Sequence, residues 1–380
     1  MKNKFKFLGL CAVVLLASCS SDDDANRFDG SEVNIGNSDV EILLSSGART
    51  RGSVESDESG AFEVDGIGVF CLAKGNLGIN EYELPINWSR DVSNDHWSIW
   101  MDNVKSDAVI EGGSTSIHWA DPEAVYMYPT GNWHGYDFYA YYPYQEDVNI
   151  AGEVLSADII LDGTQDVIWG RATSEEANAY SAKYFRGASS VAPNVAFSHR
   201  FTRLTFTLAA GIGKDGTTAQ AKTMGVKSVE LVNVPSKVTL TIADRHNPEN
   251  NGKIDADWTN NLISYNLLDT LDLEFPELNS ELDLGYWVKD EECKLGQGFL
   301  IPVPEEGHTM RIRTILQNRD GYVFDKTEYP IDLLLNEGFQ FEAGKSYNIK
   351  MIVNGPESVV LKATLTGWVD SGDSMIDREY

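Results

Sequence analysis

The chain has 380 residues, which exceeds the roughly 250 to 300 residues at which a single hydrophobic core stops growing, so two domains are expected. Its 30 Lys and Arg residues against 58 Asp and Glu residues give a net charge of -28, which repels phosphate backbones and anionic lipid headgroups. Nucleic acid is therefore excluded as an expected partner.

The first residues have the composition of an export signal. Lysines among the first six residues precede an apolar run at residues 7–17, which is shorter than the roughly 20 residues of a membrane-spanning helix. The run leads through Leu-Ala-Ser into Cys19, a pattern that resembles a bacterial lipobox. We therefore interpret residues 1–18 as a lipoprotein signal peptide and Cys19 as the lipidated residue. An ordinary secretory signal followed by an incidental cysteine is the alternative.

Acidic and polar residues follow Cys19. The run Asp22-Asp23-Asp24 resembles the export tag with which Bacteroidetes lipoproteins reach the outer face of the outer membrane, and a solvated charged linker is the alternative. Residues 20–32 are rich in Ser, Asp, Asn and Gly and have little to bury, so they are predicted to form a flexible tether. The expected location is the outer-membrane surface, with outer-membrane lipid as a partner through Cys19.

The segment that follows the tether predicts a strand and then an accessible loop. Residues 39–44, DVEILL, alternate so that one face of the strand is apolar. The side chains on that face are Val40, Ile42 and Leu44. The next segment, SSGARTRG, places Arg49 and Arg51 among small and polar residues, as in loops that proteases reach. From these residues alone, an ordinary interstrand loop explains the two arginines at least as well.

Strand patterns dominate the rest of the chain. Three later segments alternate apolar and polar residues with a period of two: TRLTFTL at 202–208, TMRIRTIL at 309–316 and SVVLKATLTGW at 358–368. Turn signals separate such runs: GIGKDGTT at 211–218, NPENNG at 247–252, PEEG at 304–307 and NEG at 336–338. The fold class is therefore predicted to be mainly β, with antiparallel β-sandwiches. One helix is predicted, at residues 174–185 with Ser174 as its N-cap.

Motifs for catalysis and cofactor binding are absent from the sequence. It contains no GxSxG, HExxH, Walker-type phosphate loop or dinucleotide-binding GxGxxG, and its histidines form no HxH or HxxxH pair. The segment NPENNGKIDADW departs from a calcium loop at the bidentate glutamate, where Trp258 stands. We therefore predict no enzyme activity, no cofactor and no metal site. A glycan hydrolase is the alternative that needs two carboxylates about 5 to 10 Å apart in an exposed cleft.

Two further features leave alternatives open. Cys71 and Cys293 can form a disulfide only if the fold brings their Cα atoms within about 7 Å, and two buried thiols are the alternative. The cluster YMYPTGNWHGYDFYAYYPY at 126–144 predicts either a ligand-binding platform or rings that alternately fill a core. The platform requires several neighbouring side chains to be exposed: Tyr126, Trp133, His134 and Tyr136.

Five phrases, in this order along the chain, carry a family resemblance. They are YDFYAYYPY, DVIWGRAT, VAFSHRFTRLTFTL, FEAGKSYNIKMIV and ATLTGWVD. Behind a lipobox, they resemble the fimbrillins, the type V pilus subunits of Bacteroidales. The resemblance implies two tandem transthyretin-like β-sandwich domains, which we place at residues 53–193 and 194–380 because Pro193 precedes a strand pair.

The resemblance also implies a route of assembly. An Arg-specific protease would cut after Arg49 or Arg51, at the end of the 19–52 segment, and remove the lipidated tether with the N-terminal strand. A strand from another subunit would then fill the groove, so that other pilus subunits are partners and a pilus is the final location. The tail VDSGDSMIDREY is a poor donor strand because acids interrupt its apolar residues, and this favours a tip or accessory subunit. The alternative is a surface lipoprotein that does not polymerise and binds glycans or host ligands through the aromatic cluster.

Overall fold

The computed structural model describes most of the chain. The described residues are 37–46, 62–76, 86–90, 97–111, 114–130, 134–173, 180–187, 192–268, 287–305, 308, 310–318, 323–331, 341–356 and 358–366. They consist mainly of β-strands arranged in five sheets, so the predicted mainly β fold class is confirmed.

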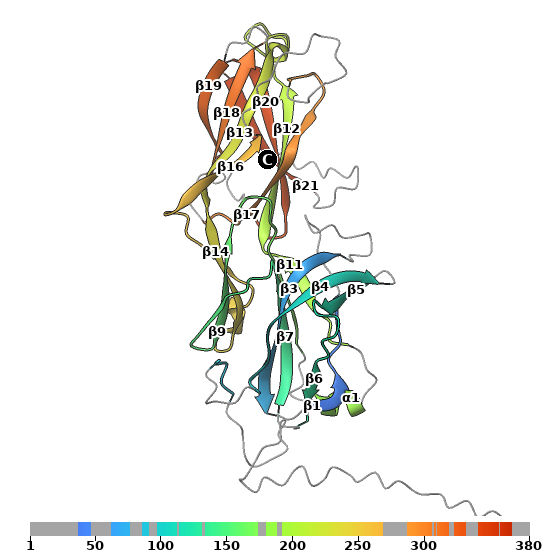
Figure 1. The fold of residues 1–380 in the computed structure, drawn as a ribbon. Helices are drawn as coiled ribbons and strands as arrows, with labels where there is room; N and C mark the ends of the chain where they lie inside the picture. Colours follow the sequence, from blue (N-terminus) through green and yellow to red (C-terminus); the bar gives the residue numbers. More distant parts are fainter. Residues whose placement is uncertain are drawn as a thin grey trace, which may run out of the picture.

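A seven-stranded antiparallel sheet occupies one end of the molecule (Figure 1). Its order is β11-β10-β7-β3-β4-β5-β2. The strands are β2 (Leu44–Ser46), β3 (Val64–Asn76), β4 (Ile99–Glu111), β5 (Ser114–Trp119), β7 (His134–Tyr142), β10 (Ile168–Ala172) and β11 (Ala196–His199). Beside it lies a two-stranded sheet of β1 (Asn37–Glu41) and β6 (Met127–Pro129).

Two four-stranded sheets form the other end of the molecule (Figure 1). The first has the order β17-β12-β20-β21, with β12 (Phe201–Ala210), β17 (Cys293–Pro302), β20 (Ser346–Gly355) and β21 (Ser358–Thr366). The second has the order β16-β13-β18-β19, with β13 (Met224–Pro235), β16 (Leu262–Leu268), β18 (Met310–Asn318) and β19 (Val323–Ile331). The pairing of β12 with β20 is parallel, whereas the other pairings of these sheets are antiparallel.

The fifth sheet crosses the expected domain boundary at residue 193. Its order is β15-β14-β9-β8, with β8 (Val148–Ala151), β9 (Val154–Ile160), β14 (Lys237–Asp244) and β15 (Ile254–Ala256). The ladder between β9 and β14 runs from Lys237 opposite Ile160 to Asp244 opposite Val154. Backbone hydrogen bonds therefore join the two parts of the chain, and the division into residues 53–193 and 194–380 stays a prediction.

The alternation read from the sequence is present in the strands. On β12, Leu204, Phe206 and Leu208 are buried, while Thr205 and Thr207 between them are half-buried. β-Branched and aromatic residues pack well on such a pleated surface, which explains why this segment becomes a central strand between β17 and β20.

Strand β7 differs because both of its faces are buried. Tyr139 and Tyr141 belong to the larger of two hydrophobic clusters, and Tyr136 and Phe138 belong to the smaller one. The seven-stranded sheet is therefore covered on both sides, as is usual for a strand with a nearly continuous apolar and aromatic sequence.

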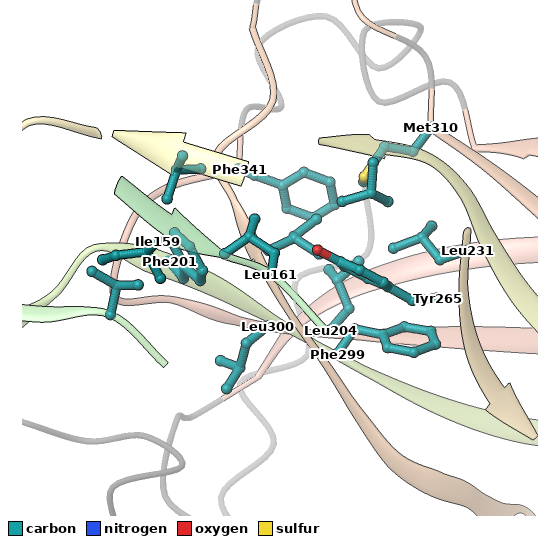
Figure 2. Packing of buried hydrophobic residues seen from close by; sticks show 14 of the residues in the cluster. Ile159, Leu161, Phe201, Leu204, Leu231, Tyr265, Phe299, Leu300, Met310 and Phe341 are labelled. Carbon is teal, nitrogen blue, oxygen red and sulfur yellow. The ribbon is translucent and has the colours of Figure 1, made fainter. Parts of the chain in front are cut away.

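The larger cluster is continuous across residue 193. Figure 2 shows Ile159 and Leu161, which lie before that position, among side chains that come after it, such as Phe201 and Leu300. The backbone N–H of Leu300 also donates to the carbonyl of Gly163 over 2.8 Å. A shared core of this kind couples the stability of the two parts of the chain.

Helix α1 (Ala182–Gly187) is shorter than predicted. Tyr180 has a φ of 48°, in the left-handed region, so a right-handed helix does not pass through it, and the prediction was wrong there. The hydroxyl of Ser181 accepts the N–H of Tyr184 over 3.2 Å and acts as the N-cap. Ser174 lies outside the described residues. Two short 3-10 turns lie at Ala221–Thr223 and Pro248–Asn250. Among the described residues, no helix has the length and apolarity needed to cross a membrane.

Candidate functional site

The N-terminal strand segment, residues 37–46, closes the seven-stranded sheet. Its first half, β1, pairs with β6, and the N–H of Ile42 donates to the carbonyl of Tyr126 over 2.8 Å. Its second half, β2, pairs antiparallel with β5, with Leu44 opposite Ile117 and Ser46 opposite Thr115. The segment therefore contacts two different elements in succession.

The other edge of β2 is also hydrogen-bonded. Ser45 donates its N–H to the carbonyl of Pro193 over 3.0 Å and accepts the N–H of Val195 over 2.8 Å, in a parallel bridge to Asn194. The hydroxyl of Ser46 donates to the carbonyl of Val195 over 3.1 Å. Residues 193–195 lead directly into β11, the strand at the opposite end of the seven-stranded sheet. Strand β2 is therefore hydrogen-bonded to β5 on one side and to the segment that precedes β11 on the other.

The side chains of this segment alternate as the sequence predicts. Ile42 is 0% exposed and Leu44 is 4% exposed, whereas Leu43 between them is 58% exposed. Val40 is half-buried and packs against the same smaller hydrophobic cluster. Burial of each large apolar side chain contributes about 1.5 to 3 kcal/mol, so two fully buried ones contribute about 3 to 6 kcal/mol to docking.

The groove under the segment is apolar. The smaller cluster combines the two buried side chains of the segment with residues of the sheet and its flanks, among them Phe62, Ile117, Val195 and Phe197. The rings of Phe62 and Phe197 meet edge to face, with centroids 5.4 Å apart. Removal of residues 37–46 would expose this surface and the hydrogen-bonding edge of β5, a combination that templates strand addition.

Substitution of Ile42 by aspartate is expected to undock this segment. A carboxylate at a position without solvent access loses its hydration, and leaving the groove costs only the docking energy of about 3 to 6 kcal/mol. Amide hydrogen exchange should become faster at Val195 and at the residues that face β2. Leu43→Asp is the matched control, because that adjacent side chain already faces water, and it should leave exchange unchanged. Equal protection in both variants would contradict the docking described here.

The aromatic cluster at 126–144 fills the interior more than it faces solvent. Tyr136 is 3% exposed, its hydroxyl donates to the carbonyl of Trp97 over 3.0 Å, and burial raises the pKa of Tyr136 well above its ordinary value. It is therefore not a ligand-binding aromatic in this structure. Tyr126 is half-buried. Trp133 and the side chain of His134 lie outside the described residues. The expected platform is consequently not assembled by the members that the structure describes.

The two described cysteines are not joined in a disulfide and lie in different surroundings. Cys71 is buried in the smaller cluster, while Cys293 is half-buried against the larger one. Burial, and secondarily the nearby charge of Asp137, raise the pKa of the Cys71 thiol well above its ordinary value. Such a thiol does not form the reactive thiolate at neutral pH.

The polar loop near residue 247 is held by its own hydrogen bonds. The carboxylate of Asp244 accepts the N–H groups of His246 and Asn247 and the side-chain amide of Asn250, at 2.9 to 3.0 Å. These bonds lower the pKa of Asp244 against the effect of its burial. Across the ranges that the structure describes, no group of three or more His, Cys, Asp or Glu side chains has a metal-binding arrangement.

Several predicted positions lie outside the described residues: Cys19, Arg49 and Arg51, together with the signal peptide, the tether and the tail after residue 366. Sequence reasoning missed the contact between Ser45 and residues 193–195. Only the small, hydroxyl-bearing pair Ser45-Ser46 at the end of an alternating run hints at a close approach between backbones, and such a signal does not identify the partner.

Comparison with known proteins gives a family and a set of distant structural neighbours. A family model described as fimbrillin-like matches residues 50–368. None of the curated proteins that were compared matches the chain. Among solved structures, a protein assigned to cell adhesion from Bacteroides uniformis is 15% identical, with 87% of this chain and 98% of that chain covered and a TM-score of 0.49.

Two further neighbours carry fimbrial descriptions. A fimbrial protein from Bacteroides vulgatus is 11% identical, with 87% of this chain and 99% of that chain covered and a TM-score of 0.48. The tip fimbrial protein Mfa3 from Porphyromonas gingivalis, with a C-terminal truncation, is 11% identical, with 86% and 100% covered and a TM-score of 0.38. The family model spans most of the chain, and the chain therefore belongs to the fimbrillin-like family.

Proposed function

We propose that the protein is a structural and adhesive subunit of a cell-surface pilus and that it assembles by strand exchange. Membership of the fimbrillin-like family supports a fimbrial role rather than a catalytic one. The observation that carries the proposal is the docking of β2, which is hydrogen-bonded to β5 on one edge and to residues 193–195 on the other. A strand held in this way can be replaced by another strand of the same register.

The order of features along the chain supports a single maturation step. Cys19 precedes the N-terminal strand segment, and Arg49 and Arg51 follow it. One cut after either arginine would therefore release the lipid attachment and the strand together. Before the cut, the protein would be an outer-membrane lipoprotein at the cell surface, and an Arg-specific protease would be its processing partner. After the cut, other pilus subunits would be its partners.

The groove sets requirements for a donor strand. It has to place large apolar side chains where Ile42 and Leu44 lie, and a small hydroxyl-bearing one where Ser46 lies. It also has to offer backbone groups to Pro193 and Val195. Two fully buried apolar side chains contribute about 3 to 6 kcal/mol, which is comparable to the association cost of at least roughly 4 kcal/mol. Durable assembly therefore also requires the backbone hydrogen bonds and further apolar contacts of the donor.

The tail of this chain fits those requirements poorly. The residues after Trp368 are VDSGDSMIDREY, in which acids interrupt the apolar positions. A donor with a carboxylate facing the groove would lose the energy of at least one buried side chain and add a desolvation cost. This favours a tip or accessory position, in which the subunit accepts a strand and donates none.

Treatment of the full chain with an Arg-specific protease is expected to give a product that begins at Thr50 or Gly52. N-terminal sequencing identifies the product, and the double variant Arg49→Lys/Arg51→Lys is the control that should give no product beginning at Thr50 or Gly52. The cut product should accept a synthetic peptide of residues 37–46, while the same peptide with Ile42→Asp should not bind. Intact, lipidated monomer as the only form on cells would contradict the proposal.

A further inference from the structure

A hollow of about 460 Å³ lies between the end of β5 and the residues that precede β6. The hollow is open to solvent, so it would hold a small ligand against one wall rather than enclose it. Apolar and aromatic side chains share its wall with charged ones. The lining residues are Asp102, Val104, Lys105, Trp119, Ala120, Asp121, Ala124 and Tyr126. None of the functions assigned above uses this hollow.

Two aromatic rings form a corner in the hollow. The rings of Trp119 and Tyr126 have centroids 5.0 Å apart and an interplanar angle of 65°, and both side chains are half-buried. The backbone beside Tyr126 is held on two sides. Its own carbonyl accepts the N–H of Ile42, and the carbonyl of Met127 accepts the indole N–H of Trp100 over 2.7 Å. The ring of Tyr126 therefore projects from a backbone that is fixed before any ligand arrives.

Charged groups surround the aromatic corner. Both oxygens of Asp102 accept hydrogen bonds from the fork of Arg90, at 2.7 and 2.8 Å, which orients the carboxylate. One oxygen of Asp121 accepts the N–H of Glu123 over 3.0 Å, which holds a second carboxylate in a tight turn. Lys105 contributes an ammonium donor and also lies over the ring of Tyr144, 5.6 Å from its centroid. Each carboxylate keeps further lone pairs for a ligand.

We propose that this hollow binds a neutral saccharide. The C–H face of a sugar ring is apolar and suits an aromatic surface, while its hydroxyls donate to carboxylates and accept from an ammonium group. Carboxylates and an ammonium group are both present in the wall of the hollow, where Asp102 and Asp121 lie with Lys105, and Asp102 is also paired with Arg90. Anionic ligands are opposed by the net charge of -28, whereas the hydroxyls of a neutral sugar can use both kinds of group.

Of the residues named for the platform read from the sequence, the site uses Tyr126 alone. It combines Tyr126 with Trp119, a residue outside the 126–144 cluster, and it does not use the buried Tyr136. It also lies beside the N-terminal strand segment, because Tyr126 is hydrogen-bonded to Ile42. A strand that replaces residues 37–46 has to restore this bond in order to keep the corner in place.

Saturation-transfer NMR on the full chain tests the proposal with a defined set of probes: D-galactose, N-acetyl-D-glucosamine, L-fucose, N-acetylneuraminic acid and choline. We expect at least one neutral sugar to bind with a millimolar Kd, because a single ring offers few atoms to a shallow site. Trp119→Ala should weaken that binding about tenfold. Asp121→Asn should weaken it less, because the amide still accepts the bond that holds the turn.

Control variants distinguish the loss of the binding site from the loss of the folded structure. Glu249→Gln changes an exposed acid far along the chain and should leave binding unchanged. If Trp119→Ala lowers stability, Asp121→Asn and Lys105→Met still report on the site, and circular dichroism confirms that they are folded. Binding of choline or N-acetylneuraminic acid without any neutral sugar would overturn the proposal. So would neutral-sugar binding that all three variants retain in full, or no binding by any probe at 50 mM, a concentration about ten times a low-millimolar Kd.

Discussion

Replacement of Trp169 by alanine is expected to lower the free energy of unfolding by about 3 to 5 kcal/mol, one of the two largest effects predicted for this chain. Trp169 lies on β10 in the seven-stranded sheet, yet its indole N–H donates to the carbonyl of Ile242 on β14 over 2.9 Å. The side chain is 6% exposed. It therefore fills space between two sheets, and its loss leaves a cavity and an unpaired carbonyl.

A half-buried cation adds to this effect. The guanidinium of Arg200 lies over the ring of Trp169, 4.6 Å from its centroid. Burial, and secondarily the charge of Arg171, lower the pKa of Arg200 to about 10, so the group is still charged at neutral pH. The face of the indole stabilises that desolvated charge by up to about 2 kcal/mol. An alanine at Trp169 removes this contribution together with the packing.

The turn at residue 252 explains why the fit is tight. Gly252 has a φ of 75°, and a Cβ atom there would lie 2.6 Å from the Trp169 ring and 2.6 Å from an Arg200 nitrogen. Only glycine allows the loop between β14 and β15 to close over the indole. Because the neighbouring atoms are already in close contact, they do not move in to fill the cavity that Trp169→Ala creates. The loss of unfolding free energy is therefore expected in the upper part of its range.

Chemical denaturation monitored by circular dichroism measures the effect. Trp169→Phe should lose less than Trp169→Ala, because it keeps a ring below Arg200 but not the indole N–H. Trp100→Ala is the control: this indole also donates to a backbone carbonyl, but its side chain is only half-buried, so its loss should cost less. A loss below about 1 kcal/mol for Trp169→Ala would show that the two sheets do not depend on this contact.

The local structure of the strands was predictable because it depends on local pattern. Alternation identified the inward faces of β12 and β18, and it identified Ile42 and Leu44 on the N-terminal strand segment. The pleat of a strand dictates which of its own residues share a face, so the printed order of residues suffices for that inference.

The partners of each strand were not predictable for a related reason. Nothing in the residues around Ser45 specifies Pro193 and Val195, about 150 positions away, and nothing in β9 specifies β14. Pairing of this kind depends on the path of the whole chain rather than on a period. The same limit applies to the hollow, where Trp119 meets Tyr126 only because β5 and the loop before β6 are brought together.

The aromatic run on β7 could not be assigned to a core or to a binding platform from its sequence alone. Tyr136 belongs to a dense aromatic run that suggests a binding platform, but β7 is buried on both faces and encloses it. The sequence shows that aromatic rings are present on the strand, but it does not show which face of the strand the rest of the fold covers. The predicted helix at 174–185 is helical only from Ala182 among its described residues, since the left-handed φ of Tyr180 is incompatible with a right-handed helix at that position.

Loss of the contact between His199 and Asp166 is expected to have the second large effect on the free energy of unfolding. The His199 Nδ1 atom lies 2.5 Å from Asp166 Oδ2, and the two side chains are 2% and 0% exposed. The other Asp166 oxygen accepts the N–H of Val167 over 2.8 Å. His199→Ala or Asp166→Ala is expected to cost about 3 to 5 kcal/mol, because each leaves a buried polar partner behind.

A double-mutant cycle distinguishes this pair from ordinary packing. The double variant Asp166→Ala/His199→Ala should lose clearly less than the sum of the single variants, since neither partner then remains buried alone. His118→Ala is the matched control, because His118 and Glu111 form a pair at 3.3 Å with both side chains about half exposed, and its loss should cost at most about 1 kcal/mol. Additive losses at Asp166 and His199 would contradict the coupling.

The position of the pair links its stability to the proposed strand exchange. His199 ends β11, opposite Ile168 on β10, and the strand begins directly after the residues that bind Ser45. When the N-terminal strand segment leaves, residues 193–195 lose one partner and depend on β11 for their place. His199→Ala should therefore weaken capture of the peptide of residues 37–46 by the cleaved protein, whereas His118→Ala should not. Equal capture of the peptide by both variants would show that residues 193–195 keep their position without the buried pair.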